Sequence, residues 1–317
     1  MHTSHICILG GTGFVGGHLA TRLCQKNVKL TLLVRNAERA KHLSVLPSLN
    51  AIECDIFNPQ QLEKQLKNID VVINLVGILN ERGHNGDGFR RTHLELPRRI
   101  LDACHHQKVT RILHMSSLNA DANTGPSHYL RSKGDGENHL HTFAGSCTVT
   151  SFRPSVIFGP GDSFFNRFAK LLRLSPGLFP LACGHARFAP VFVGDVVDAI
   201  IQAIDNKSTY GKRYDLCGPE DFTLNELVRY TAQTLGKQTY IMNLPRVLAR
   251  LQAQLLEFMP GKPFSIDNYN SLQVDSVCNN GQRMPTSISS IVPWYLGKPS
   301  QQMDIYRRNV GRRNVGR

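Results

Sequence analysis

A tyrosine and a lysine four residues apart, Tyr129 and Lys133, form the pair in the sequence that points most directly to chemistry. On a helix, residues at this spacing share one face. A phenol with a pKa of about 10 is a poor acid–base group at neutral pH, but a nearby ammonium favours the phenolate and lowers that pKa. We therefore predict that Tyr129 transfers a proton and that Lys133 tunes it and also holds a nicotinamide ribose. The alternative is an accidental pair on an exposed helix face.

Two serines, Ser116 and Ser117, follow an apolar segment at 111–115 that is typical of a buried strand. In an open α/β sheet, ligands bind at the carboxyl ends of the strands. A serine at this place can hydrogen-bond a substrate carbonyl together with a tyrosine. The alternative is that the two serines only terminate the strand.

A glycine-rich turn occupies residues 10–16, directly after an apolar segment at 5–9 and at the start of a helical pattern. Glycines at this spacing allow a tight turn and let backbone N–H groups approach a pyrophosphate at the helix N-terminus. This placement disfavours a plain glycine-rich turn. The turn, a strand-end serine and a Tyr-x-x-x-Lys pair, in this order, are far more specific together than apart. The predicted cofactor-binding residues of the turn are Gly10, Thr12, Gly13, Phe14, Val15 and Gly16.

The residue after the second predicted strand discriminates between the two nicotinamide cofactors. An acid at this position would bind the ribose 2′-hydroxyl of NAD, whereas an arginine suits the 2′-phosphate of NADP. The residue is Arg35, which favours NADP(H), with NAD(H) as the alternative if the arginine only stacks on the adenine or is solvated. Asp55, after the third strand, is a candidate for the adenine edge. It is equally well explained as a turn-forming residue before Asn58 and Pro59.

Short apolar segments alternate with amphipathic ones through the first half of the chain. This alternation predicts an α/β fold of the Rossmann type, with a doubly wound parallel sheet and a small C-terminal α/β substrate lobe. The predicted domains are an NAD(P)-binding core at 1–155, a mixed part at 156–300 that completes the sheet and forms the lobe, and a basic, disordered tail at 301–317. We expect strands at 5–9, 28–34, 51–54, 71–76, 111–115 and 148–152, and helices at 14–25, 88–107, 129–143, 193–204, 223–235 and 245–259.

The composition excludes several classes of protein. The chain of 317 residues is 41% apolar and 19% charged, which is typical of a folded protein. Its apolar stretches are shorter than the roughly eighteen residues of a membrane-spanning helix, and the N-terminus does not read as a signal peptide. The eight cysteines form no C-x-x-C pair, which argues against a zinc module and a secreted disulfide framework. Histidines at 105–106, 139 and 141 lack ligand partners, so we expect no metal. The cysteine pattern predicts a reducing, cytoplasmic location.

The net charge of +13 is partly a property of the C-terminal segment. Residues 245–317 contain ten Lys or Arg and four acids, an excess of six. The pattern at 246–259 predicts a basic amphipathic helix whose apolar face packs on the core. The alternative is an interfacial helix that, with the arginine tail, attaches the protein to the inner face of the cytoplasmic membrane. Nucleic acid is disfavoured as a partner because the tail has one aromatic residue. The apolar residues of the helix are Val247, Leu248, Leu251, Leu255 and Leu256.

Taken together, these motifs resemble the short-chain dehydrogenase/reductase superfamily in its extended or atypical form, over residues 5–260. The resemblance implies a catalytic triad of Ser, Tyr and Lys, in which Ser117 matches the serine best and Ser116 second. It also implies cofactor-binding residues after the fourth and sixth strands, near the nicotinamide, namely Val76, Gly77, Pro154 and Val156.

A narrower resemblance, at 158–169, 190–196 and 255–275, is to the family of the nucleotide-binding accessory subunit of mitochondrial complex I (alpha-subcomplex subunit nine). It implies a bacterial-type member, a kin protein in coenzyme Q biosynthesis, and NADPH that is structural rather than consumed. The sequence departs from catalytic extended enzymes at His93, where an asparagine is usual, and in the short spacing from Ser117 to Tyr129. Both departures disfavour a sugar-nucleotide substrate.

These observations predict an NAD(P)-dependent oxidoreductase of the epimerase/dehydratase-like type, acting on an apolar, quinone- or isoprenoid-like carbonyl or alcohol. The first alternative is a non-catalytic accessory or assembly protein of a respiratory or ubiquinone-biosynthesis complex, stabilised by NADPH. The second is a nucleotide-sugar epimerase or dehydratase. The pair of Tyr129 and Lys133 favours the oxidoreductase, and the basic C-terminal part favours the accessory protein.

Overall fold

A computed structural model describes residues 3–43, 45–46, 48–259, 262–279 and 283–297. The chain forms two compact units. Unit 1 comprises Met1–Pro154 and Gly194–Leu216, and unit 2 comprises Ser155–Val193 and Cys217–Arg317. The predicted disordered tail, 301–317, lies outside the described residues.

Unit 1 is built on a parallel sheet whose seven strands, in the part of the chain that the structure describes, follow the order β11-β6-β5-β4-β1-β2-β3. The order runs outward in both directions from β1 and β4, which is the doubly wound arrangement predicted from the sequence. The fold class is therefore confirmed. The strands are β1 (His5–Leu9), β2 (Lys29–Val34), β3 (Leu49–Glu53), β4 (Val71–Asn74), β5 (Arg111–Met115), β6 (Thr148–Pro154) and β11 (Arg213–Leu216).

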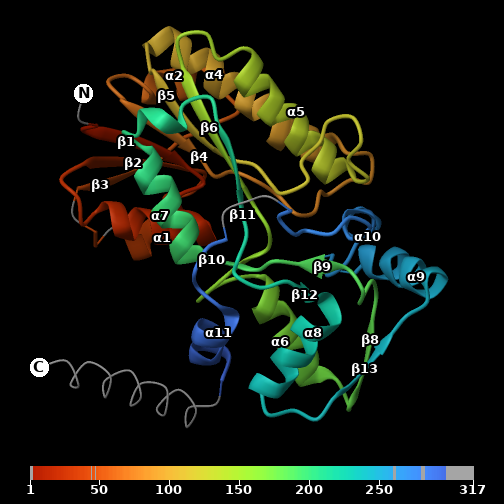
Figure 1. Ribbon diagram of the computed structural model, residues 1–317. Coiled ribbons are helices and arrows are strands. Elements are labelled where there is room, and N and C mark those ends of the chain that lie inside the picture. The colour runs from red at the N-terminus through yellow and green to blue at the C-terminus, as the bar shows by residue number, and fades with distance from the viewer. Residues whose placement is uncertain (1–2, 44, 47, 260–261, 280–282, 298–317) are drawn as a thin grey trace, which may run out of the picture. The chain divides into compact units, whose positions relative to one another are not determined.

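Helices cover both faces of this sheet (Figure 1). One face carries α1 (Phe14–Leu23) and α7 (Val193–Ala203), and the other carries α2 (Pro59–Gln65), α4 (Leu96–Gln107) and α5 (His128–Thr142). The strands are nearly continuous apolar runs because both of their faces are buried. Between the sheet and the second group of helices lies one core cluster that includes Leu9, Leu33, Leu62, Val72, Ile100, Leu101, Ile112, Leu140 and Val149.

Short elements complete unit 1. They are η1 (Ala37–Leu43), α3 (Asp87–Arg90), the π-helical turn η2 (Arg91–Glu95) and η3 (Lys207–Thr209). The π-helical turn interrupts the helix predicted at 88–107. A π-helical turn inserts a residue into a helix and is frequent at functional sites. This interruption positions His93, as described below.

In its described residues, unit 2 contains three two-stranded ribbons and a set of helices around an aromatic core. Its helix α8 begins at the predicted capping box, in which Thr223 and Glu226 exchange hydrogen bonds. The core includes Phe158, Phe165, Leu227 and Val292. The elements are β7 (Ile157–Phe158), α6 (Phe164–Leu174), β8 (Leu178–Leu181), β9 (Arg187–Phe188), β10 (Val191–Phe192), β12 (Phe222–Thr223), α8 (Leu224–Thr234), β13 (Tyr240–Asn243), α9 (Arg246–Glu257), α10 (Ile266–Ser271) and α11 (Ile288–Leu296).

Helix α9 corrects one prediction. The leucine-rich face of this helix was expected to pack on the core, but the buried residues are Ala249 and Ala253. Ala249 packs against Ala182, Cys183 and Ala186. Close packing between small residues leaves no room for leucine on that side, so the larger apolar residues are exposed.

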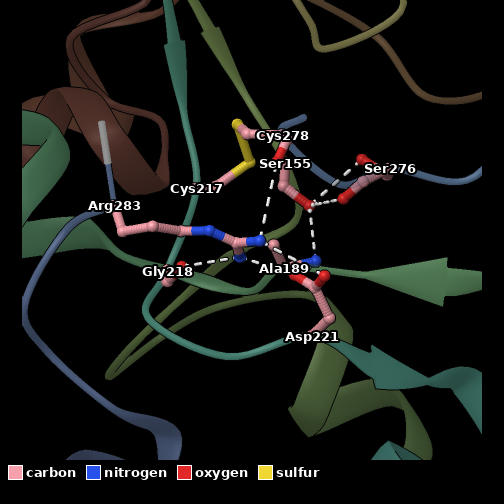
Figure 2. The surroundings of a disulfide bond; sticks show 8 residues. All are labelled: Ser155, Ala189, Cys217, Gly218, Asp221, Ser276, Cys278 and Arg283. Atoms are coloured by element: carbon pink, nitrogen blue, oxygen red, sulfur yellow. Dashed lines mark hydrogen bonds and ion pairs between the residues drawn. A yellow bond between two sulfur atoms is a disulfide. The ribbon is translucent and has the colours of Figure 1, made fainter. Parts of the chain in front are cut away.

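A disulfide joins Cys217 and Cys278 within unit 2, and the other cysteines in the described residues are free. Figure 2 shows how the two cysteine segments are also tied by Arg283, which donates to the Gly218 carbonyl oxygen and pairs with Asp221. The scattered cysteines did not predict this bridge, because its partners are 61 residues apart in the sequence. Isolated β-bridges, Cys217 to Arg283 and Phe188 to Ser276, bring the two segments together. Among the described residues, no helix is long and apolar enough to span a membrane.

Candidate functional site

The glycine turn lies at the point where the strand order of the sheet reverses. β1 pairs with both β2 and β4, and the carboxyl ends of β1 and β4 therefore lie side by side. A Cβ atom on Gly10 would come within 3.0 Å of the Leu75 carbonyl carbon and 3.1 Å of the Val76 amide nitrogen. Gly10 also has a positive φ of 82°. This residue must be glycine for the turn to abut the segment that follows β4.

Gly16 is required by the close contact of α1 with the turn that precedes it. A Cβ atom there would lie 2.3 Å from the Gly10 carbonyl oxygen and 2.6 Å from the Gly11 Cα atom. Gly13, in contrast, is exposed, and its N–H group donates to the Gly10 carbonyl oxygen at 3.0 Å. It is the N-cap of α1 and caps it without a side chain. Around it, Thr12, Phe14 and Val15 are half-buried.

These features fit a dinucleotide. The start of α1 is open at Gly13, and the first N–H groups of a helix favour a phosphate through hydrogen bonds and the helix dipole. The turn approaches the β4 end closely enough for one extended ligand to contact both. The structure therefore places the glycine turn next to Val76.

Arg35 and Asp55 lie at the carboxyl ends of β2 and β3, on the same edge of the sheet as the glycine turn. Arg35 is exposed and directly follows β2. Asp55 is also exposed, and its carboxylate accepts a hydrogen bond from the Phe57 N–H at 3.0 Å. Asn58 then caps α2 by accepting from the Gln61 N–H. One oxygen of Asp55 thus has the turn-forming role that the sequence left as the alternative.

Lys133 is buried beneath the residue that follows β4. Its ammonium donates to the Met115 carbonyl oxygen at 2.9 Å, and the side chain is almost wholly buried. A Cβ atom on Gly77 would lie 3.2 Å from the lysine Nζ and 3.6 Å from the His93 Nε2. Gly77 itself is exposed, so the ammonium lies one residue layer below the surface at the β4 end. Burial lowers the pKa of Lys133 to about 8.

Tyr129 lies one turn earlier on α5, which begins where Ser127 accepts a hydrogen bond from the Leu130 N–H. The tyrosine is half-buried, and its ring meets the edges of two neighbours. The ring centroid is 5.5 Å from that of His93 and 6.1 Å from that of Phe89. Since Phe89 is on α3 and His93 is on η2, the π-helical turn helps to form the wall beside the tyrosine.

His93 is held in one tautomer by its partners. Its Nε2 accepts from the Ile78 N–H at 3.1 Å, so the ring proton is assigned to Nδ1. Nδ1 then donates to the Ser132 hydroxyl oxygen at 2.9 Å, and that hydroxyl donates to the Tyr129 carbonyl oxygen. Burial and the nearby charge of Lys133 hold the pKa of His93 well below its ordinary value. The ring is therefore neutral and connects the β4 end to α5.

The two candidate serines differ in their partners. Ser116 is buried, and its hydroxyl donates to the Glu137 carboxylate. Ser117 is half-buried, and its hydroxyl lies 3.2 Å from the Leu118 carbonyl oxygen. Ser117 is thus the serine that remains accessible at the β5 end, and Ser116 belongs to a structural network.

That network centres on Glu137, which belongs to none of the predicted motifs. The carboxylate is fully buried and accepts from the Arg153 Nε at 2.9 Å and from the Arg213 Nε at 2.7 Å. Glu137 follows Lys133 by four residues, so the two share a face of α5. The ion pairs fix this face against β6 and β11, and thereby fix Lys133. The signal in the sequence was an acid four residues after Lys133, on the same face of the helix.

The predicted residues after β6 fall in different units. Pro154 ends β6 in unit 1, where its carbonyl oxygen accepts from the Leu118 N–H at 3.0 Å, next to Ser117. Val156 belongs to unit 2, where its carbonyl oxygen accepts from the Val191 N–H at 2.9 Å. The structure therefore joins Pro154, and not Val156, to the serine loop within one unit. Across the described ranges, no group of three or more His, Cys, Asp or Glu side chains could hold a metal ion.

Comparisons with known proteins agree with this geometry. The model of the NAD dependent epimerase/dehydratase family matches residues 6–217. Among similar curated proteins is the mitochondrial NADH dehydrogenase (ubiquinone) 1 alpha subcomplex subunit 9 of Arabidopsis thaliana, 26% identical over 95% of this chain and 77% of that protein. A mitochondrial NADH-ubiquinone oxidoreductase 40 kDa subunit of Neurospora crassa is 27% identical over 78% of this chain and 65% of that protein. The chain thus spans about two thirds to three quarters of these two relatives.

Two further proteins extend the comparison. A ceramide reductase of Caulobacter vibrioides is 26% identical over 76% of this chain and 73% of that protein. Among solved structures, UDP-glucuronic acid 4-epimerase from Bacillus cereus, in complex with UDP-glucuronic acid and NAD, has a TM-score of 0.67 at 20% identity. The alignment covers 85% of this chain and 99% of that one. At this identity the likeness shows the fold alone.

Proposed function

Because the chain belongs to the NAD dependent epimerase/dehydratase family, we propose that it binds a nicotinamide dinucleotide and is an oxidoreductase acting on an apolar carbonyl or alcohol. One observation carries the proposal. The buried ammonium of Lys133 lies beneath Gly77 at the β4 end, one helical turn from the half-buried ring of Tyr129. Packing of α5 against the sheet does not require a lysine at the buried position 133. A tyrosine that acts as an acid–base group at neutral pH does require a nearby positive charge.

The glycine turn would hold the pyrophosphate at the start of α1, and Val76 and Gly77 would contact the ligand where it passes the β4 end. Arg35 is exposed at the end of β2, in the position where an arginine accommodates a 2′-phosphate. This favours NADP(H) over NAD(H). The turn contact of Asp55 leaves its second oxygen for the adenine edge.

The bound dinucleotide would supply or accept the hydride. Tyr129 would give a proton to the substrate oxygen during carbonyl reduction and take it back during alcohol oxidation. A charged Lys133 would favour the phenolate form of Tyr129. The pKa of Lys133, about 8, leaves the lysine mostly protonated at neutral pH. Ser117 would donate a hydrogen bond to the same substrate oxygen. His93 is neutral and adds no positive charge of its own, so the charge that acts on the Tyr129 phenol is the ammonium of Lys133.

An apolar substrate is supported by the surroundings of the tyrosine and by one relative. The rings of Phe89 and of an uncharged His93 pack against the ring of Tyr129. The relative named ceramide reductase acts, by its name, on a lipid. We infer a quinone-like, isoprenoid-like or other lipid-like carbonyl or alcohol as the substrate class.

A second candidate is a non-catalytic accessory or assembly protein that binds NADPH for stability. Two relatives named as respiratory-complex subunits favour it, since one matches across 95% of this chain. A third candidate is a nucleotide-sugar epimerase or dehydratase, which the structural likeness alone suggests. His93 and the short spacing from Ser117 to Tyr129 count against the third candidate.

The test begins with the purified protein. The co-purifying nucleotide is identified by mass, and the loaded protein is mixed with a short-chain quinone while the absorbance of the reduced nicotinamide is followed. Bound NADPH that is consumed supports the oxidoreductase and the role of Arg35. Bound NADPH that persists with the quinone and with a ketosphingoid lipid favours the accessory protein. Bound NAD(H) would contradict the assignment from Arg35.

A further inference from the structure

Helix α9 of unit 2 buries small residues and exposes large apolar ones, the opposite of an ordinary surface helix. Its fully buried residues are the small ones, Ala249 and Ala253. Its larger apolar residues are exposed, with 79% of Val247 and 64% of Leu255 accessible. A helix that only packs on its own core buries leucine and exposes small or polar residues. The exposed face of α9 is therefore a candidate docking surface.

The exposed apolar residues form one continuous stripe. At about 100° per residue, they fall within an arc of roughly 120°, and the two alanines lie on the other side. The stripe continues past the end of the helix, where 82% of Phe258 is exposed. We call this stripe the α9 face; it consists of Val247, Leu248, Leu251, Leu255, Phe258 and Met259.

The ribbon of β8 and β13 lies beside α9 in unit 2 (Figure 1). The Gln252 side chain joins the two by donating to the Pro180 carbonyl oxygen at 3.2 Å. On this ribbon Leu178, Tyr240 and Met242 are also exposed, while Ile241 and Leu181 face the core. The alternation of the strands thus adds a second apolar row next to the helix. Contiguous apolar surface of this kind marks a site of protein or membrane interaction.

Charge distinguishes between these occupants. Arg246 and Arg250 are exposed and lie one turn apart on α9, outside the apolar arc, and Glu257 falls on the same side of the helix. From residue 245 onward the sequence carries ten Lys or Arg against four acids, and the whole chain carries +13. Six of those ten lie at 298–317, outside the described residues, and the described part carries four against three acids. A helix with an apolar face and a basic flank lies in the plane of a membrane interface, where anionic headgroups meet the arginines.

We propose that the α9 face docks unit 2 on the surface of an anionic lipid bilayer. Leucine, valine and phenylalanine side chains enter the acyl boundary, and Arg246 and Arg250 contact the headgroup phosphates. The attachment is peripheral and reversible. It is independent of the proposed oxidoreductase activity, because it rests on residues of another unit.

The test is flotation of the full-length protein with vesicles of phosphatidylcholine alone or mixed with phosphatidylglycerol. We expect binding to the anionic vesicles that is at least tenfold tighter than to phosphatidylcholine, and that weakens with added salt. Leu251→Gln with Leu255→Gln removes apolar area without changing charge and should weaken binding at least tenfold. Arg246→Gln with Arg250→Gln should remove most of the preference for the anionic lipid.

The matched control is Phe143→Gln with Leu174→Gln, which replaces apolar residues that are 59% and 75% exposed elsewhere. It should bind vesicles like the unchanged protein. Thermal unfolding of each variant shows that its fold is retained. The proposal is overturned if the unchanged protein does not float with anionic vesicles, or if the leucine pair leaves flotation unchanged. It is also overturned if sedimentation finds a lipid-independent dimer that the leucine pair dissociates, since the occupant is then a second copy.

Discussion

The two halves of the candidate site in unit 1 are built in different ways. The glycine turn is local: the seven consecutive residues 10–16 form it, and backbone contacts within it require glycine at position 16. The Tyr129 and Lys133 region is assembled from the ends of β4 and β5, the π-helical turn η2 and α5. A short sequence motif is thus enough to form the dinucleotide-binding turn. The environment of Tyr129 and Lys133, in contrast, depends on tertiary packing.

The largest expected effect comes from placing a side chain in the glycine turn. Gly16→Val places a side chain where even a Cβ atom would lie 2.3 Å from the Gly10 carbonyl oxygen, so the backbone must move. We expect dinucleotide affinity to fall at least 100-fold, about 2.7 kcal/mol, as measured by nicotinamide fluorescence titration. Gly17→Ala is the control, because a Cβ atom there meets nothing within 4 Å. It should bind normally and gain up to about 1 kcal/mol of stability. Equal affinities in both variants would contradict the turn as the binding element.

Removing the ammonium tests the other half. Lys133→Met keeps the length of the buried side chain and deletes its charge. We expect turnover of the reduced dinucleotide to fall about 100-fold, because the phenol loses its electrostatic activation. Affinity for the dinucleotide should fall less than tenfold, through loss of the ribose contact. If Lys133→Met binds the dinucleotide poorly but turns over normally at saturating dinucleotide, the role of Lys133 is in binding and not in catalysis, which contradicts the division of roles between the two halves.

The same lysine sets a pH dependence of stability. Its pKa is lowered from 10.5 to about 8 by burial, so between these pH values the native state binds fewer protons than the unfolded state. The free energy of unfolding should therefore rise as the pH increases from about 8 to 10.5. This contribution is at most about 3 kcal/mol. Urea unfolding of the unchanged protein and of Lys133→Met isolates it, since only the unchanged protein should show the rise. Parallel stability curves would mean that the lysine is not charged and buried.

The two serines should separate activity from stability. Ser116→Ala removes a donor from the buried Glu137 carboxylate and should lower the free energy of unfolding by about 1–3 kcal/mol, with turnover nearly unchanged. Ser117→Ala should lower turnover about tenfold and leave stability within about 0.5 kcal/mol. Chemical denaturation and single-turnover rates of both variants check the pair. The opposite pattern would make Ser116 the serine of the site.

The smallest expected effect is at His93. His93→Asn loses ring contacts with Tyr129 and Phe89 and should lower stability by about 1 kcal/mol. Because burial and Lys133 keep the pKa of His93 well below its ordinary value, the acid limb of the pH–rate profile should not move. A shift of that limb in the variant would show that His93 titrates during turnover.

Much of unit 1 could be predicted from the sequence, because its strands and crossover helices have strong local patterns. The segments predicted at 5–9 and 111–115 match β1 and β5, and the fold class and the family are confirmed. The glycine turn could be recognised because its constraints act over seven residues. Tyr129 and Lys133 fall on one helix, as their spacing predicts.

What could not be predicted depends on distant partners. The burial of Glu137 is explained by Arg153 and Arg213, which come from β6 and β11. The disulfide joins cysteines 61 residues apart. The face of α9 that is buried was predicted wrongly, because a periodic pattern shows that a helix has an apolar stripe but not whether alanines provide a closer fit to the core.

The most direct test of the central claim is single-turnover consumption of bound reduced dinucleotide by Tyr129→Phe, beside its binding affinity. The acceptor is whichever quinone or ketosphingoid lipid the unchanged protein reduces. The variant keeps the ring that packs on His93 and Phe89 and deletes one hydroxyl. We predict affinity within twofold of the unchanged protein and consumption at least 100-fold slower. Unchanged consumption, or no acceptor for either protein, would contradict the account that the glycine turn binds and the Tyr129 and Lys133 pair reacts.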